Sequence, residues 1–169
     1  MEVRTGAAGT RQGEVMGHWL LKTEPDVFSF DDLMRAPGRT TGWDGVRNYQ
    51  ARNFLRDAMK KGDLVLIYHS SADPPAVAGV AEVVREGYPD PSQFDPKDDH
   101  FDPESTPGAP RWYQVDVKAV RKLARPVSLP EIRQTKALAK MPLVQRGQRL
   151  SVQPVGAKEF ELIVRMGEK

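Results

Sequence analysis

Residues 43–53 read Trp-Asp-Gly-Val-Arg-Asn-Tyr-Gln-Ala-Arg-Asn. The run combines an aromatic side chain, a turn signal, an Arg-Asn-Tyr cluster and the beginning of a basic helix. Few segments that only build a core need this mixture, whereas the binding of a planar, polar ligand beside phosphates needs all of it. A ring can stack on such a ligand, an amide can read its polar edge, and guanidinium groups can meet its charge.

The elements around this run predict a small curved sheet or barrel with peripheral helices. Predicted strands cover residues 18–22, 64–69, 76–84 (interrupted by Gly79), 112–117 (continuing to about 123) and 150–152. Predicted helices begin after Ser29, run over residues 49–61, begin after Ser128 and include residues 160–164. Ser29 with Asp32, and Ser128 with Glu131, have the spacing of capping boxes. The strands outnumber the helices without alternating regularly with them, which argues against a doubly wound fold. Residues 87–110 predict a long ordered loop.

Composition limits the possible classes of function. The chain has 169 residues, of which 39% are hydrophobic and 28% charged, as in an ordinary globular protein. It has no cysteine, which excludes disulfides, thiolate nucleophiles and cysteine-ligated metals. No apolar run approaches the roughly 18–20 residues of a membrane span. We expect one domain over residues 18–169, a flexible extension over residues 1–17, and a monomer.

The charge is unevenly distributed although the formal net charge is only +2. Acidic residues dominate from 90 to 104, and basic residues dominate from 111 to 149. Such asymmetry indicates either a surface that faces a polyanion or a solvated basic face with no partner.

Several residues are candidates for a ligand pocket, and each has a simpler alternative. Trp43 lies on a turn, where it can wall a pocket or plug the core, and Trp112 beside Arg111 is a second aromatic candidate. Asn48 can read a polar edge or cap the following helix. Polar residues that end two predicted strands can border a pocket or make ordinary loop hydrogen bonds, and Lys22 can instead pair with Glu24 on the surface. The predicted pocket residues are Lys22, Thr23, Glu24, Trp43, Val46, Asn48, Tyr68, His69, Ser70 and Trp112.

A basic stripe on the helix over residues 49–61 is the candidate phosphate contact. Arg52, Arg56 and Lys60 repeat every four residues, so a continuous helix would place them on one face. Arg47 and Arg111 are the further candidates. The alternative is a solvated helix face without a ligand.

A catalytic interpretation is weaker. Glu24 and Asp44 could form a carboxylate pair with His69 as a general base. The sequence has no glycine-rich phosphate loop, no metal-ligand spacing and no nucleophile elbow to accompany them. We therefore expect no catalytic residue, no metal and no cofactor.

An ordered set of segments resembles the EVE domain family over residues 18 to 167. The segments are 19–25, 43–53, 62–63, 68–70, 80–84, 88–90, 94–96, 110–112 and 149–155. Thr23 departs from the family's usual serine but keeps a hydroxyl group. The resemblance implies an α+β fold: a PUA-like β pseudo-barrel of about five to six mostly antiparallel strands with peripheral α-helices, related to the YTH domain.

The resemblance also implies a function. It predicts a non-catalytic module that holds a modified nucleobase, such as methylated or hydroxymethylated cytosine, in an aromatic pocket. The base would enter between Trp43 and Trp112, and Arg47, Arg52 and Arg56 would hold the flanking phosphates. The alternatives are an RNA-binding accessory of tRNA or rRNA metabolism and a hydrolase of modified nucleotides. The partner would be DNA or RNA, without a membrane or a metal, in a bacterial cytoplasm with access to the nucleoid or in a eukaryotic nucleus.

Overall fold

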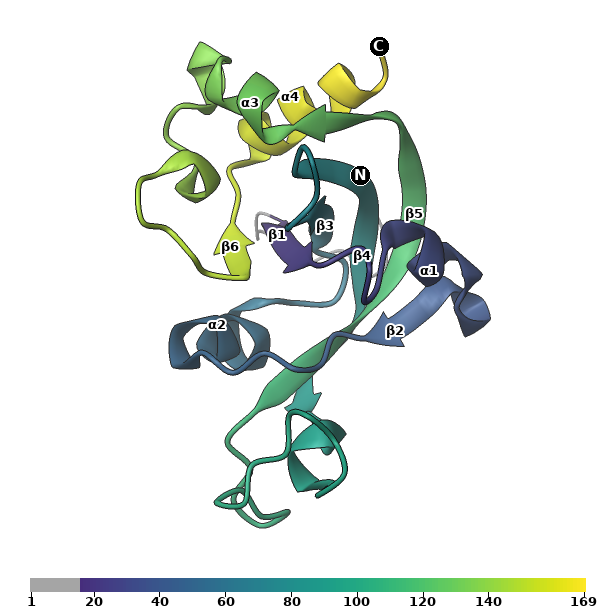
Figure 1. Cartoon of the computed structure of the whole chain (residues 1–169), viewed down its shortest axis with the longest axis vertical. Coiled ribbons are helices and arrows are strands. Elements are labelled where there is room, and N and C mark those ends of the chain that lie inside the picture. The colour runs from purple at the N-terminus through teal and green to yellow at the C-terminus, as the bar shows by residue number, and fades with distance from the viewer. Residues whose placement is uncertain (1–15) are drawn as a thin grey trace.

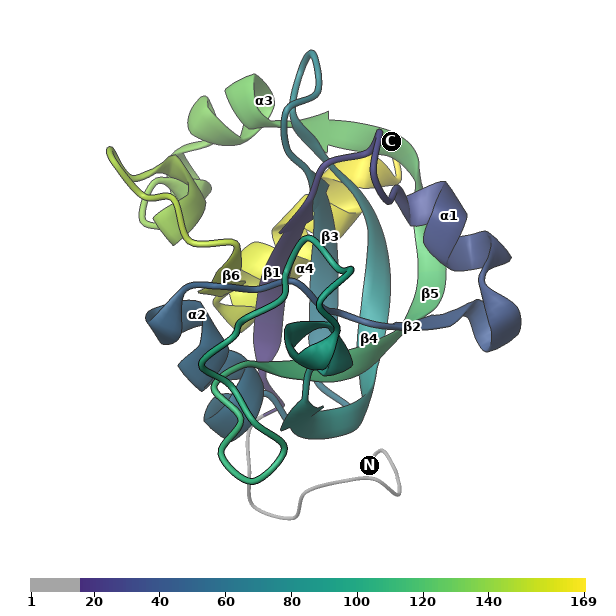
Figure 2. The ribbon, with the colours of Figure 1, turned by 60° about the horizontal axis from the view of Figure 1, so that its bottom comes forward.

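A computed structural model describes residues 16–169, which fold around one curved, six-stranded sheet (Figure 1). Its strand order is β2-β5-β4-β3-β1-β6. The strands are β1 (His18–Thr23), β2 (Thr40–Gly42), β3 (Leu64–His69), β4 (Ala76–Pro89), β5 (Tyr113–Ser128) and β6 (Val152–Pro154). β1 and β3 run parallel, and the other four pairings are antiparallel. The sheet curls without closing (Figure 2), which confirms the predicted pseudo-barrel of mostly antiparallel strands.

Within residues 16–169, four α-helices lie around this sheet. They are α1 (Phe30–Arg35), α2 (Tyr49–Asn53), α3 (Leu129–Arg133) and α4 (Ala157–Gly167). The Ser29–Asp32 capping box predicted for α1 is formed in both directions. The second predicted box is only half formed, because Ser128 accepts from the Glu131 N–H while the Glu131 carboxylate binds Arg125.

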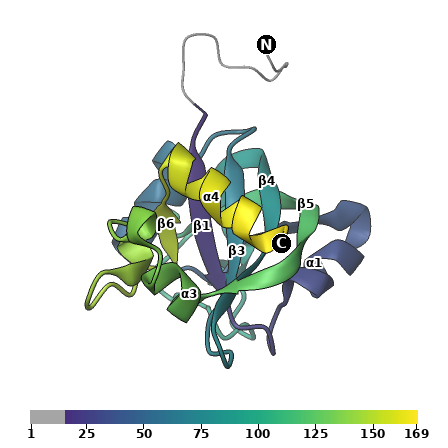
Figure 3. The ribbon, with the colours of Figure 1, turned by 90° about the horizontal axis from the view of Figure 1, so that it is seen from above.

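Alternation along the strands divides the hydrophobic residues into two clusters. In β1, Leu21 belongs to the inner cluster and its neighbour Leu20 to the outer cluster. The inner cluster includes residues of α1 and α2, and the outer cluster includes residues of α3 and α4. Figure 3 shows α4 lying across β1 and β3 on the outer side. The two faces of the sheet therefore have separate coverings, and the face on which a strand residue lies decides its neighbours.

The predicted strand over residues 76–84 is too short, because β4 continues to Pro89 and pairs with β5 along its length. Gly79 does not interrupt it. A Cβ atom at Gly79 would lie 2.5–2.6 Å from the ring of Phe30. Glycine is therefore required there by the close approach of α1 to the sheet. The long loop predicted for 87–110 accordingly begins only after Pro89.

The helix predicted over residues 49–61 is also corrected. The α-helical hydrogen bonding ends at Asn53 and gives way to a π-helical segment, Phe54–Ala58. Met59 then has an extended backbone, with φ −76° and ψ 127°. A four-residue repeat needs a regular α-helix, so the predicted stripe of Arg52, Arg56 and Lys60 does not form one continuous face.

The predicted extension over residues 1–17 falls outside the described residues, except for Met16 and Gly17. The Gly17 N–H donates to the Asp63 carboxylate (3.0 Å), and the Gly17 carbonyl accepts from the Leu64 N–H (3.1 Å). Gly17 is thus already hydrogen-bonded to the body of the fold.

Candidate nucleic-acid interface

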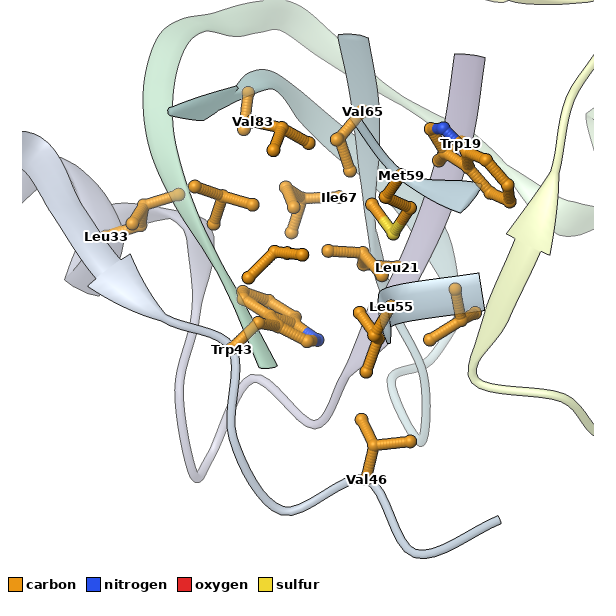
Figure 4. Packing of buried hydrophobic residues seen from close by; sticks show 14 of the residues in the cluster. Trp19, Leu21, Leu33, Trp43, Val46, Leu55, Met59, Val65, Ile67 and Val83 are labelled. Carbon is orange, nitrogen blue, oxygen red and sulfur yellow. The ribbon is translucent and has the colours of Figure 1, made fainter. Parts of the chain in front are cut away.

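Trp43 lies at the end of β2 and its indole is buried. The backbone N–H of Trp43 donates to the Val115 carbonyl (2.8 Å), which extends the pairing of β2 with β5 by one residue. Only 7% of the residue is exposed, and its ring meets that of Phe28 edge to face, with centroids 6.2 Å apart. Figure 4 shows the indole pointing into the inner cluster, and it shows Val46 at the edge of the side chains that make up this cluster. Of the two readings of Trp43, the structure thus supports a place in the core.

Trp112 belongs to a different aromatic group. Its ring stacks on Tyr49 with centroids 4.8 Å apart and planes 26° apart, and its Nε1–H donates to Asp102 (2.7 Å). Tyr49 is 52% exposed and the Arg52 guanidinium lies 4.9 Å from its ring centroid. The two indoles therefore have separate ring partners, Phe28 and Tyr49, and the entry of a base between Trp43 and Trp112 stays a prediction.

Tyr49, which lies between Trp112 and Arg52, was not among the residues predicted for the site. It is the first residue of α2, directly after the cap Asn48. A large ring that is half exposed and stacked on a buried indole is a surface on which a base can stack. Its position at the solvent-facing start of a basic helix was the signal in the sequence.

Arg47 is held within the chain. Its guanidinium donates to the Asp90 carboxylate (3.1 Å) and to the Ser92 hydroxyl (3.0 Å). It also donates to the carbonyl oxygens of Val46 (3.0 Å) and His100 (3.1 and 2.7 Å). These contacts occupy all five N–H donors of an arginine. The structure therefore leaves Arg47 without a donor for the phosphate role predicted above.

The fully buried carboxylate of Asp90 organises this loop. It accepts from the N–H of Gly45 (2.8 Å), from Arg47, and from both the N–H (2.8 Å) and the hydroxyl (2.6 Å) of Ser92. Burial works to raise the pKa of Asp90, but the hydrogen bonds from Ser92, Gly45 and Arg47 outweigh it and hold that pKa below its usual value. The residues after Trp43 are thereby tied to the segment after β4.

The remaining predicted phosphate contacts differ in their pairing. Arg56 binds Asp57 (2.8 Å) and Arg111 binds Glu104 (2.7 Å), so a carboxylate already neutralises each of them. Arg52 donates to the Arg111 carbonyl (2.7 Å) and to the Asn53 side chain (2.9 Å). Within residues 16–169, Arg52 and Lys60 have no carboxylate at ion-pair distance. These two cations are the ones that remain open to a phosphate.

The predicted group at the ends of β1 and β3 is divided between the two faces of the sheet. Lys22 is paired in register with Tyr68, and Thr23 with His69. Thr23 and His69 lie two residues after Leu21 and Ile67, which belong to the inner cluster. The alternation of the strands therefore places both side chains on the inner face, where they hold the start of α1. The Thr23 hydroxyl donates to the Phe28 carbonyl (2.7 Å), and His69 Nε2 accepts from the Phe30 N–H (3.0 Å). Burial lowers the pKa of His69 and so favours the neutral ring, in which Nε2 can accept this hydrogen bond.

Lys22 and Tyr68 lie on the outer face. They line a pocket of about 470 Å³ together with Arg133 and the segment from Leu143 to Arg149. The alternation of the strands therefore separates residues that were predicted to share one pocket.

The other polar candidates lie on the surface or in caps. Asn48 caps α2 through its side-chain oxygen, which accepts from the Ala51 N–H (3.0 Å), so the capping alternative is confirmed. The Ser70 N–H donates to the Thr23 carbonyl (2.9 Å), and Glu24 is exposed in the turn that follows β1.

The three histidines, including the His69 of the catalytic interpretation, make separate contacts. His69 is occupied by the start of α1, His18 meets the ring of Phe160 at 4.8 Å, and His100 pairs with Asp98 at 3.3 Å. Among residues 16–169, no three His, Cys, Asp or Glu side chains gather where they could hold a metal ion. No helix in the described part of the chain is long and apolar enough to cross a membrane.

The sheet is open and carries helices on both faces, and an aromatic and basic loop follows β2. These features define a class of protein, and a family model identifies that class. The model of the EVE domain matches residues 17–166, so the chain belongs to the EVE domain family. Among characterised sequences, it is similar to human thymocyte nuclear protein 1, with 42% identity over 98% of this chain and 80% of the human protein.

Two solved structures support the same assignment. A protein from Leishmania major superposes with a TM-score of 0.86 at 46% identity, covering 93% of this chain and 98% of that one. Human thymocyte nuclear protein 1, solved in complex with DNA containing 5-methylcytosine, superposes with a TM-score of 0.81 at 43% identity. That comparison covers 90% of this chain and 98% of the human one.

Proposed function

We propose that this chain is a non-catalytic module that binds nucleic acid and recognises a modified cytosine. The observation that carries the proposal is its likeness, at 43% identity over 90% of its length, to a human protein solved with 5-methylcytosine-containing DNA. The aromatic residues and the unpaired Arg52 near the loop after β2 support the same conclusion, because ring stacking and phosphate neutralisation are the general means of binding a strand.

The base-contacting surface that we propose consists of the loop after β2 and the Tyr49–Trp112 ring pair. Stacking on such rings contributes roughly 1–3 kcal/mol per base without distinguishing one base from another. Polar groups at the rim must therefore supply specificity. The Asn48 amide nitrogen can donate, and the exposed Asp44 carboxylate can accept from the amino group of cytosine. Trp43 and Val46 lie beneath this loop as its apolar floor.

The phosphate contacts that we propose are Arg52 and Lys60. Both are free of ion-paired carboxylates within the described residues, and Arg52 lies directly beside Tyr49. A base stacked on Tyr49 would bring its own flanking phosphates within reach of Arg52. Arg56, paired with Asp57, would contribute less.

Discrimination by a single methyl group is expected to be modest. Burying one methyl group contributes about 0.8 kcal/mol, or about a fourfold difference in affinity. Extruding a paired base costs a few kcal/mol, and an unpaired base costs less. The preference for 5-methylcytosine should therefore be clearest in single-stranded or mismatched DNA.

The test is a fluorescence-anisotropy titration with oligonucleotides that differ only in one methyl group, carried out at two salt concentrations. An RNA of the same sequence provides a third arm. We expect tighter binding of the methylated DNA and weaker binding of all ligands at higher salt. Equal affinities that do not change with salt would refute the proposal, and tighter binding of the RNA than of either DNA would favour the RNA-binding alternative.

Asn48 offers a variant that separates recognition from capping. Asn48→Ser keeps an oxygen that can cap α2 but removes the amide donor. We expect unchanged stability and weaker binding of the methylated and the unmethylated DNA alike, because the amide would contact a polar edge that both bases share. Gln134→Ser, which removes an exposed amide at the end of α3, is the control.

The proposal contains no chemical reaction. Incubation with modified nucleosides and nucleotides, followed by mass spectrometry, should return the substrates unchanged, and any product would contradict the non-catalytic role. We place the protein where nucleic acid is accessible: the cytoplasm of a bacterium or the nucleus of a eukaryote.

A further inference from the structure

A pocket opens on the outer face of the sheet, on the side of β1 and β3 opposite to the inner cluster. Lys22 and Tyr68, which are paired in register, form one wall. The other walls are Arg133, at the end of α3, and the segment from Leu143 to Arg149 that leads toward β6. Its volume is about 470 Å³. Pockets of roughly 300–1,000 Å³ are the usual size for a small-molecule site.

The charges around this pocket are all of one sign. Four cationic side chains line it, namely Lys22, Arg133, Arg146 and Arg149, and no acidic side chain does. None of the four has an ion-paired carboxylate within residues 16–169. Nearby cations on the same side of the molecule do have one: Arg125 pairs with Glu131 at 2.6 Å. Four like charges around one concavity repel one another until an anion enters.

The pocket also contains a buried polar group without a partner. Tyr68 is only 4% exposed and lines the pocket, yet its hydroxyl makes no hydrogen bond with any described residue. A buried hydroxyl normally has a partner, because leaving it unsatisfied costs free energy. Arg133 is close enough to act electrostatically on the phenol. The hydroxyl is thus placed to donate to an anion that the cations hold.

We propose that this outer pocket is a phosphate-binding site, separate from the base-contacting surface. Arginine side chains and a hydroxyl donor suit the oxygens of a phosphate monoester or diester, and the volume leaves room for more than the phosphate alone. The phosphate can belong to a nucleic-acid strand or to a free mononucleotide. Because Lys22 and Thr23 are consecutive residues on opposite faces, a strand bound at one face could pass to the other around the end of β1.

The test compares two double variants that remove the same charge from the same region. Arg146→Gln with Arg149→Gln alters the pocket, whereas Lys136→Gln with Lys140→Gln alters exposed residues outside it. The probes are inorganic phosphate, cytidine monophosphate and a single-stranded oligonucleotide, measured by calorimetry and NMR titration. We expect the pocket variant to lose at least about tenfold in affinity for phosphate-bearing probes, and the control variant to change little.

Tyr68→Phe removes only the hydroxyl, so it tests the pocket without changing the charge. Removing an unpartnered hydroxyl should leave the stability of the fold unchanged or raise it, while the affinity for the same probes falls by a few fold. If Tyr68→Phe lowers stability and leaves affinity unchanged, the hydroxyl serves the fold and that part of the proposal is refuted.

The three probes also identify the source of the phosphate. If the strand occupies the pocket, the pocket variant lowers the slope of log affinity against log salt for the oligonucleotide by about 1.4, or roughly 0.7 for each phosphate contact. If a free nucleotide occupies it, only the phosphate and mononucleotide affinities fall. Equal affinities of the two double variants for all three probes would overturn the proposal. The preference for 5-methylcytosine reports separately on the base-contacting surface, so either proposal can fail without the other.

Discussion

Polar residues at the neighbouring ends of β1 and β3 have two different roles, one on each face of the sheet. On the inner side, Thr23 and His69 are bonded to Phe28 and Phe30 and hold the start of α1. On the outer side, Lys22 has no ion partner and the Tyr68 hydroxyl has no hydrogen bond among the described residues. Polar side chains at a strand end are therefore not in themselves a site. Those that are satisfied within the fold support its structure, and those that are not are the ones a ligand can use.

Of the substitutions that test this contrast, the one on the inner side at Phe30 is expected to have the largest effect on stability. Phe30 is 1% exposed and its ring fills the space above Gly79. Phe30→Ala should lower the free energy of unfolding by about 3–5 kcal/mol, because it leaves a cavity between α1 and the sheet. Urea denaturation measures the change. Val27→Ala, at a side chain that is 77% exposed, is the control, and equal losses in the two variants would contradict the packing described.

A smaller loss is expected when the acceptor for α1 is removed. His69→Ala leaves the Phe30 N–H without its partner and should cost about 1–3 kcal/mol of unfolding free energy. His69→Gln can return an acceptor oxygen and should recover part of the loss. A His69→Ala protein as stable as the original would show that solvent replaces the imidazole at no cost.

The stability should also depend on pH through the same histidine. Burial holds the pKa of His69 below its usual value, and it does the same for His18. The unfolded chain takes up each proton near pH 6.5, about the usual histidine value, but the folded chain does so only at lower pH. The stability that depends on these two neutral histidines should therefore be at its full value above about pH 6.5. Below that pH, the free energy of unfolding should fall by at most about 1.4 kcal/mol per pH unit for each proton.

Denaturation curves between about pH 7 and pH 5 test this dependence, since most carboxylates titrate below that window. His69→Gln should make the dependence shallower without removing it, because His18 remains. Identical slopes for the two proteins would mean that His69 does not titrate differently on folding.

The smallest effect is expected on the outer side. Lys22→Met removes a partly buried ammonium group that has no ion partner, and burial alone already lowers the pKa of Lys22. The free energy of unfolding should change by less than about 0.5 kcal/mol, with a gain more natural than a loss. A large loss would show that Lys22 is part of the supporting structure and would remove the contrast with His69.

Much of the fold could be predicted from local chemistry. The β-formers of residues 64–69 gave the bounds of β3 directly, and the Ser29–Asp32 pair located the start of α1. What the sequence could not reveal were events that depend on distant packing. The change to π-helical hydrogen bonding after Asn53 and the ring of Phe30 against Gly79 are set by tertiary contacts rather than by propensity.

The candidate site was predicted less completely, for a related reason. The sequence indicates that Lys22, Thr23, Tyr68 and His69 end two strands, but the pairing of those strands is needed to know which ends share a face. Arg47 was also ambiguous, because its main partner, Asp90, lies 43 residues away. Arg146 and Arg149 were noted only as part of a basic stretch, since nothing local shows that this segment closes a pocket over Tyr68.

The carboxylate of Asp90 has a consequence for how tightly this protein can hold a ligand. One buried group fixes Gly45, Arg47 and Ser92 at once, so the loop that we propose as the base-contacting surface loses its freedom when the chain folds. Binding then has little motion left to suppress, and more of the contact energy is retained as affinity. A loop that is rigid before binding also selects ligands of one fixed shape, which suits the recognition that we propose of a group as small as a methyl group.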